Sequence, residues 1–120
     1  MSITPLPRFN KFNWIESHNN HCRNITTSNP STLLIGDSII AGLSRYKNVW
    51  KKYFQPFNTV NCGIGGDKVQ NVLWRCNNFP PSLSVKNIVV MCGTNNIQHD
   101  SVEDITGGII DISFPTKTYL

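Results

Sequence analysis

The sequence contains no apolar run that approaches the roughly 20 residues needed to cross a membrane. Its first residues, Met1 to Pro7, lack the basic segment and the long apolar stretch of a secretory signal. We therefore expect a cytoplasmic protein without a membrane span.

Metal-binding residues are also scarce. The four cysteines form no C-x-x-C pair, and the neighbours His21 and Cys22 have no second pair at a spacing typical of zinc sites. The sequence thus predicts free thiols at Cys22, Cys62, Cys76 and Cys92, and it indicates no metal or other cofactor.

Size and charge limit the architecture. A chain of 120 residues forms one domain at most, and it is short for a doubly wound sheet, which usually needs about 150 residues to cover both faces. The net charge of +4 comes partly from Lys47, Lys51 and Lys52 on one expected helix. Such a cluster permits weak contact with nucleic acid but is more often a solvated face.

The chain divides into three segments by pattern. Residues 1–31 show no sustained period and predict an irregular leader, 32–113 alternate between strand and helix patterns, and 114–120 predict an irregular tail. Aromatic residues of the leader interleave with Arg8 and Lys11, an arrangement that can stack on single-stranded RNA. We favour the simpler interpretation that they dock on a neighbouring apolar face.

The middle segment predicts a parallel sheet of about three strands built from βαβ units. The expected strands are 32–35, 57–62 and 86–92; the expected helices are 39–54 with a break near 44–48, 68–77, and one starting near Ser101. The run 88–91 is continuously apolar, as in strands buried on both faces of a parallel sheet.

Each expected strand ends in a loop that carries a polar or glycine residue suited to acyl transfer. Ser38 provides a hydroxyl nucleophile and its own N–H, Gly66 an accessible backbone N–H, and Asn95 a side-chain amide. The loops at the carboxyl ends of parallel strands meet at one edge, so these donors are expected to face one crevice. Taken alone, Gly36-Asp37-Ser38 is equally compatible with an ordinary turn and a helix N-cap.

The three blocks Gly36-Asp37-Ser38, Gly63-Ile64-Gly65-Gly66-Asp67 and Gly93-Thr94-Asn95-Asn96 resemble, in this order, the first three blocks of the SGNH (GDSL-like) hydrolases. The stretches 63–75 and 89–96 are most similar to the platelet-activating-factor acetylhydrolase IB branch of that family. This resemblance implies a flavodoxin-like three-layer α/β/α sandwich, truncated here to about three strands, an ester or acetylated substrate, and no metal. It also implies that Ser38 is the nucleophile and that Ser38, Gly66 and Asn95 form the oxyanion hole.

The resemblance covers only the first part of such a domain. The family carries a later Asp-x-x-His block whose His is the general base, and this chain has only His18, His21 and His99. Without a base the serine is a weak nucleophile, so we expect little or no activity from this chain alone. His99 lies four residues after Asn95, but we disfavour it as a substitute for the missing general base. A third strand without further neighbours would also be an unprotected edge. We expect the isolated chain to be marginally stable, to aggregate, or to bind a partner, from the same or another chain, at that edge.

A non-catalytic binding module on the same scaffold, with an RNA or protein partner, is the alternative to the esterase. The lysine cluster, the leader and the missing base favour it, whereas the presence of Ser38, Gly66 and Asn95 together disfavours it. A nucleotide-binding role for Gly63, Gly65 and Gly66 ranks last, because Lys68 stands where G-x-G-x-x-G requires its third glycine.

Overall fold

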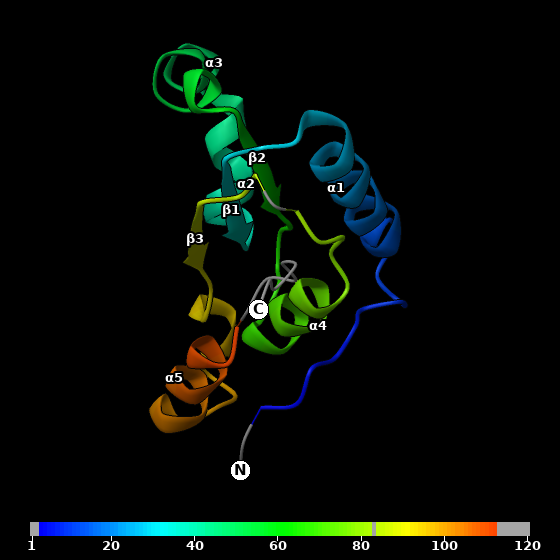
Figure 1. Cartoon of the computed structure of the whole chain (residues 1–120). Coiled ribbons are helices and arrows are strands. Elements are labelled where there is room, and N and C mark those ends of the chain that lie inside the picture. Colours follow the sequence, from blue (N-terminus) through cyan, green and yellow to red (C-terminus); the bar gives the residue numbers. More distant parts are fainter. Residues whose placement is uncertain (1–2, 83, 113–120) are drawn as a thin grey trace.

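The computed structural model describes residues 3–82 and 84–112, so the tail predicted for 114–120 lies outside the described residues (Figure 1). The strands are β1 (Thr32–Gly36), β2 (Thr59–Gly63) and β3 (Asn87–Met91). The helices are α1 (Trp14–Ser28), α2 (Ser38–Gly42), α3 (Lys47–Val49), α4 (Val69–Asn77) and α5 (Val102–Ile110).

The three strands form one parallel sheet in the order β2-β1-β3. The central strand β1 pairs on both sides, so that Ile35 lies opposite Cys62 on β2 and Val90 on β3. The predicted parallel α/β architecture with three strands is confirmed, and the observed strands shift by at most two residues from the predicted ranges.

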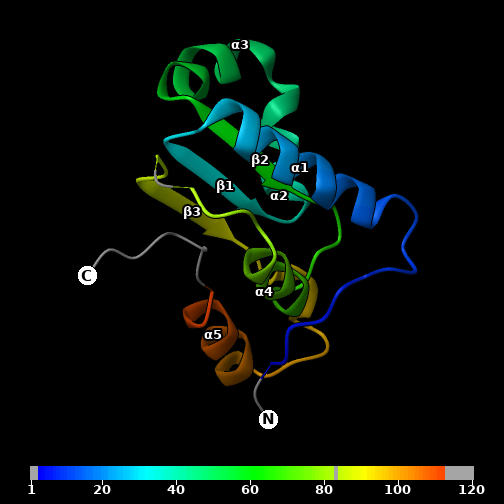
Figure 2. The same cartoon turned by 45° about the vertical axis from the view of Figure 1, so that its right-hand side comes forward.

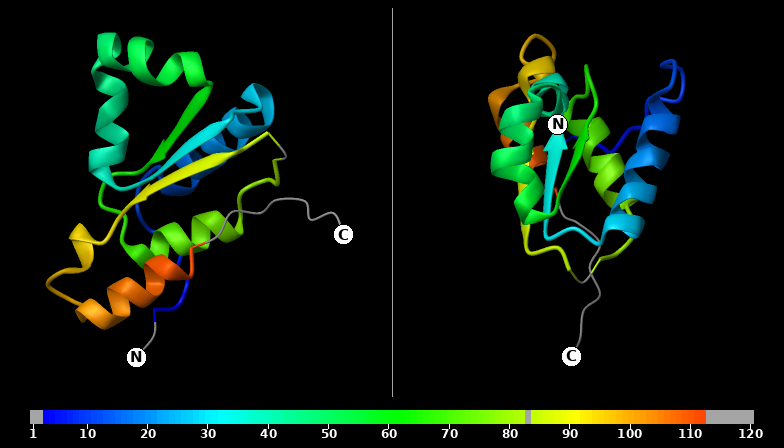
Figure 3. Two further views of the ribbon diagram at one scale, coloured as in Figure 1. Left: turned by 60° about the vertical axis from the view of Figure 1, so that its left-hand side comes forward. Right: turned by 90° about the horizontal axis from the view of Figure 1, so that it is seen from above.

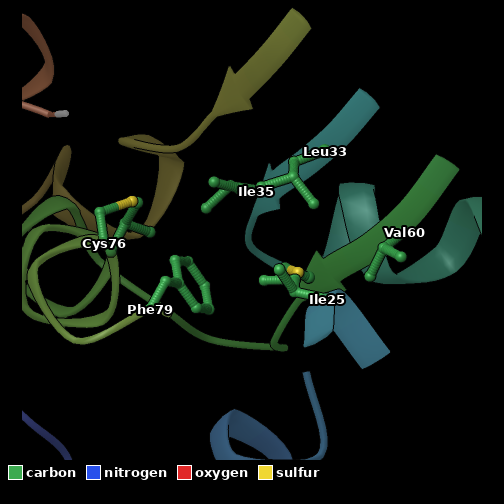
Figure 4. Close-up of a cluster of buried hydrophobic side chains, with 8 residues drawn as sticks. Ile25, Leu33, Ile35, Val60, Cys76 and Phe79 are labelled. Carbon is green, nitrogen blue, oxygen red and sulfur yellow. The ribbon is translucent and has the colours of Figure 1, made fainter. Parts of the chain in front are cut away.

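Helices cover the two faces of the sheet unequally. Helices α1 and α4 lie on one face, and α2 with the short helical turns that follow it lies on the other (Figures 2 and 3). The main core lies under α1 and α4 (Figure 4). It is formed by Ile25, Leu33, Ile35, Val60, Cys62, Val72, Cys76 and Phe79.

The edge strand β3 is largely exposed. Val89 is 50% exposed and Met91 45%, and Val90 is the one residue of the strand that packs partly against the core. The burial on both faces that is typical of a run such as 88–91 is therefore not found, because no strand or helix of the described chain covers the outer side of β3. The predicted unprotected edge is confirmed.

The first 31 residues are not an irregular leader, because α1 occupies half of them. Asn29 ends the helix in a left-handed conformation and donates its N–H to the Ile25 carbonyl (3.1 Å). Pro30 follows and cannot continue the helix. Trp14, His18 and Ile25 are buried, as expected for a leader that docks on an apolar face. Phe12, in contrast, is 87% exposed.

The region predicted as one helix over 39–54 is a chain of short helical pieces. Helix α2 ends at Gly42 and a 3₁₀ turn follows to Arg45; Tyr46, with φ −88° and ψ 78°, interrupts the helix. The break was predicted at 44–48 and is confirmed. Beyond it, α3 runs into a π-helical turn, Trp50–Phe54, and a 3₁₀ turn that contains Pro56.

Helices α4 and α5 match their predictions. Helix α4 presents Val69, Val72, Leu73 and Cys76 to the core. Helix α5 starts after Ser101, whose hydroxyl accepts the N–H of Asp104 (3.1 Å) as the sequence predicted.

Candidate functional site

Ser38 is the first residue of α2, immediately after β1, and it is exposed. The preceding Asp37 is buried, and its Oδ1 accepts the N–H of Ile39 (3.0 Å), which caps the helix. Thus the aspartate of the Gly-Asp-Ser motif holds the turn, and the serine hydroxyl is left at the surface.

The second loop lies directly beside Ser38. A Cβ built on Gly65 would lie 3.9 Å from Ser38 Cβ, and the Ile64 N–H donates to the Gly36 carbonyl (2.9 Å). The Asp67 N–H donates to the Ile64 carbonyl (3.2 Å), and Gly66 has φ +81°. This is a turn whose third position strongly favours glycine, and Gly66 is exposed there.

The third loop is attached to the second. Asn95 is half-buried, and its Nδ2 donates to the Asp67 carbonyl (3.0 Å). The buried Asn96 accepts the Val69 N–H at the start of α4 (3.0 Å) and donates to Asp100 (3.0 Å). The first loop thus contacts the second, and the second contacts the third, at the carboxyl ends of the strands.

Sequence reasoning missed the cluster of charges beneath this edge. Both carboxylate oxygens of the fully buried Asp67 are used: Oδ1 accepts from Trp14 Nε1 (2.8 Å) and Arg8 (3.0 Å), and Oδ2 accepts from Arg75 (3.3 Å). Arg75 is itself fully buried, and burial lowers its pKa while Asp67 raises it. Arg75 follows Val72 by three residues on the apolar stripe of α4, and this position was the available sequence signal.

The same cluster includes two histidines of α1. The Nδ1 atom of His21 lies 2.7 Å from Arg75 Nη2 and acts as the acceptor, because guanidinium only donates. Burial, and then the charge of Arg75, lowers the pKa of His21 to about 3 and that of His18 to about 4. Both imidazoles are therefore neutral near pH 7. They pack α1 against α4 and the residues that follow it, His21 through Arg75 and His18 through Phe79.

His99, the remaining histidine, is exposed on the third loop. It lines an open cavity of about 470 Å³ together with Asn95 and neighbouring residues of 94–98. Within residues 3–82 and 84–112, no hydrogen bond joins the His99 ring to Ser38, and Ser38 does not line that cavity.

The four cysteines are free, as predicted. Burial raises the pKa of Cys62, Cys76 and Cys92 to about 12, so these thiols are protonated at neutral pH and do not act as nucleophiles. No cluster of three or more His, Cys, Asp or Glu side chains suited to a metal ion occurs among the described residues.

A solved structure shares this arrangement of strands and helices. A Streptococcus pneumonia protein provisionally assigned as a platelet activating factor shares the fold, with a TM-score of 0.66 and 24% identity over 82% of this chain and 45% of its own. The chain thus shares the parallel α/β fold of this protein.

Sequence comparison identifies the homologues as platelet-activating factor acetylhydrolase IB subunits. The rat alpha2 subunit is 36% identical over 97 residues, and the mouse alpha1 subunit 37% over 97 residues. The match covers 80% of this chain but only 42% and 41% of those subunits, so the chain spans about two-fifths of the length of these relatives. No protein-family model matches the chain. The predicted similarity to platelet-activating factor acetylhydrolase IB subunits is confirmed by these homologues.

In the part of the chain that the structure describes, no helix is both long and apolar enough to pass through a lipid bilayer.

Proposed function

We propose that this chain carries the nucleophile part of an SGNH-type serine esterase or acetylhydrolase, which hydrolyses an ester or acetyl group. Ser38 would attack the acyl carbon, and the N–H groups of Ser38 and Gly66 with Nδ2 of Asn95 would stabilise the oxyanion. Each such donor typically contributes about 3–4 kcal/mol in the transition state.

The observation that carries the proposal is the direct contact among the three loops. Ser38 Cβ lies beside Gly65, and Asn95 is hydrogen-bonded to the carbonyl of Asp67, one residue after Gly66. The exposed Ser38 hydroxyl and Gly66 backbone are open to a substrate. Asn95 uses one amide N–H in its bond to Asp67, and the second N–H remains for the oxyanion.

A general base is not available from the described residues. His18 is buried, His21 accepts from Arg75, and the His99 ring makes no hydrogen bond to Ser38 among the described contacts. We therefore propose that this chain alone has at most about a thousandth of the activity of a complete enzyme. The base would come from the part of the fold that the relatives have and this chain does not match.

A chimera tests both parts of the proposal. Residues 1–112 would be joined to the portion of the rat alpha2 subunit that follows its match to this chain, and hydrolysis of 4-nitrophenyl acetate would be measured for the chimera and for the chain alone. We expect activity in the chimera only, and Ser38→Ala should abolish it. Ser28→Ala, at the exposed end of α1, is the matched control. A folded, active chimera that is insensitive to Ser38→Ala would contradict the assignment.

A binding module for RNA remains the second candidate because Lys47, Lys51 and Lys52 are all exposed. The leader supports it less, since Trp14 is buried and Arg8 is paired with Asp67. The proposal predicts salt-dependent retention of single-stranded RNA that is lost when the three lysines are replaced together by glutamine. Retention that survives the replacement would count against this role. We also propose that a protein partner, from the same or another chain, binds at the open edge of β3. We further propose that the protein is located in the cytoplasm.

A further inference from the structure

The helical segment that leads into β2 contains no buried residue. Residues 43–57 comprise a 3₁₀ turn, α3, the π-helical turn and a second 3₁₀ turn, and every one of them is exposed or half-buried. The segment nevertheless carries large apolar and aromatic side chains at helical spacing: Tyr46, Val49, Trp50, Tyr53, Phe54 and Phe57. Tyr46 is 66% exposed and Phe57 63%. An apolar stripe of this kind is normally buried, whereas here it is left largely open to solvent in the part of the chain that the structure describes.

All formal charges of the segment are positive. Its cations are exposed, and they are Arg45, Lys47, Lys51 and Lys52. No Asp or Glu occurs from residue 38 to residue 66, and the ion pairs of the described residues do not involve these cations. Two copies of this surface would repel each other, so its charge argues for an anionic partner and against a second copy of the chain.

Hydrogen bonds hold the segment against the sheet at both of its ends. Asn61 of β2 donates to the Ile40 carbonyl (2.7 Å) and to Ser44 Oγ (2.9 Å), and Thr59 Oγ1 donates to the Phe54 carbonyl (2.8 Å). The segment leads into β2, which is the sheet edge opposite to β3. In Figures 1 and 3, α3 and the turns next to it lie at the end of the molecule opposite α5. The exposed stripe is therefore a fixed, projecting surface that is separate from the open edge of β3.

From this combination we propose that residues 45–57 form a membrane-contact surface, which binds the anionic surface of a lipid bilayer. Helices that lie in a bilayer interface have aromatic and aliphatic side chains on one side and lysine or arginine on the other, as this segment does. The cytoplasmic leaflet of cell membranes carries anionic lipids that attract such basic residues. The membrane contact does not involve Ser38, so it goes beyond the proposed esterase and does not depend on it.

The aromatic rings of the segment favour a lipid partner over RNA. RNA bases stack on free ring faces. The rings of Trp50 and Phe54 stack on each other, with 5.0 Å between centroids and 23° between planes, and Lys52 Nζ lies 5.2 Å from the centroid of the Tyr53 ring. One face of each of these three rings is thus already occupied. Val49, which is 42% exposed, adds aliphatic surface that suits acyl chains.

Sedimentation with vesicles tests the membrane contact directly. The full chain would be mixed with vesicles of phosphatidylcholine alone and with vesicles that also contain about 30% phosphatidylserine. We expect binding to the anionic vesicles that weakens with added salt, and little binding to phosphatidylcholine alone. Lipids brominated on their acyl chains should quench the fluorescence of Trp50, and Trp50→Phe should remove this quenching. Binding without quenching of Trp50 would overturn the proposal.

Charge variants separate a specific surface from general attraction to a basic protein. The test variant carries Lys47→Gln, Lys51→Gln and Lys52→Gln, and the control carries Lys11→Gln, Arg23→Gln and Lys86→Gln. Both variants lose three exposed cations and therefore the same net charge. The test variant should bind anionic vesicles about a hundred-fold more weakly, since each lysine near such a surface contributes about five-fold. The control should lose much less, and equal losses would refute the surface.

An apolar variant separates lipid from RNA. Phe57→Ser removes an exposed ring, so it should leave the circular dichroism spectrum unchanged and weaken binding to anionic vesicles by about five-fold. Phe12→Ser, which removes an 87% exposed ring in the N-terminal segment, is the matched control and should not change vesicle binding. Equal vesicle binding by Phe57→Ser and the wild type would contradict insertion of the stripe. Retention of single-stranded RNA without any vesicle binding would assign the surface to RNA and overturn the membrane contact.

Discussion

Acidification should lower the free energy of unfolding through His18, a buried side chain of α1. His18 is 2% exposed and stacks against Trp14 and Phe79. Its burial, and then the neighbouring charge of Arg75, lowers its pKa from 6.5 to about 4. The folded protein therefore holds this imidazole neutral in a pH range where the unfolded chain protonates it.

The sign and size of the effect follow from proton linkage. Below pH 6.5 the unfolded state binds one more proton at His18 than the folded state, so the free energy of unfolding falls with pH until about pH 4 and then levels off. The difference between the two pKa values corresponds to ~3 kcal/mol across that window. A domain of this size has only about 5–15 kcal/mol in total, so the loss should be conspicuous.

Urea unfolding of the wild type and His18→Phe at pH 7.0, 5.5 and 4.5 tests this. Phenylalanine keeps an aromatic ring between Trp14 and Phe79 but cannot be protonated, so the variant should lose ~2 kcal/mol less than the wild type between pH 7.0 and pH 4.5. The remaining slope would come mainly from His21, whose pKa is lowered to about 3. His99→Gln, which changes an exposed histidine, is the matched control and should leave the slope unchanged. A His18→Phe protein with the wild-type pH dependence would refute the reasoning.

Three further changes address other parts of the fold. Gly36→Ala should destabilise the protein by ~3 kcal/mol or prevent folding, because the new Cβ would overlap the Met91 carbonyl; Gly42→Ala, with open space around it, should be neutral or stabilising in the same thermal melts. Asp67→Ala should cost ~3–5 kcal/mol in urea unfolding, since it leaves a buried guanidinium without a counter-charge, and a loss under 1 kcal/mol would show that the ion pair is unimportant. Val89→Lys on the open edge should reduce self-association in sedimentation velocity without changing the far-UV circular dichroism, and an unchanged sedimentation profile would argue against association through this edge.

The sheet could be predicted from the sequence because its determinants are local. Short apolar runs that end at glycine, followed by helical stripes, define βαβ units, and the carboxyl ends of such strands must meet at one edge. This alone placed Ser38, Gly66 and Asn95 on neighbouring loops. The open edge at β3 was also predicted, whereas the burial on both faces that the apolar run 88–91 indicated is not found.

Helix α1 and the charge cluster could not be predicted in the same way. The helix is rich in Asn, Ser, Thr and His, which have modest helix propensity, and its buried positions include a histidine. Its stability comes from contacts with residues more than 50 positions away, such as Asp67 and Arg75. A charged residue in an apolar stripe is usually placed at the surface, so the burial of Arg75 was recognisable only from the structure.

The shared use of Asp67 has an evolutionary consequence. Arg8 and Trp14 from the N-terminal segment and Arg75 from α4 donate to this single carboxylate, so loss of the acid would leave all three donors without their acceptor. Positions 8, 67 and 75 should therefore vary together among descendants of this sequence. A lineage that lost the acid at position 67 would be expected to lose both arginines with it.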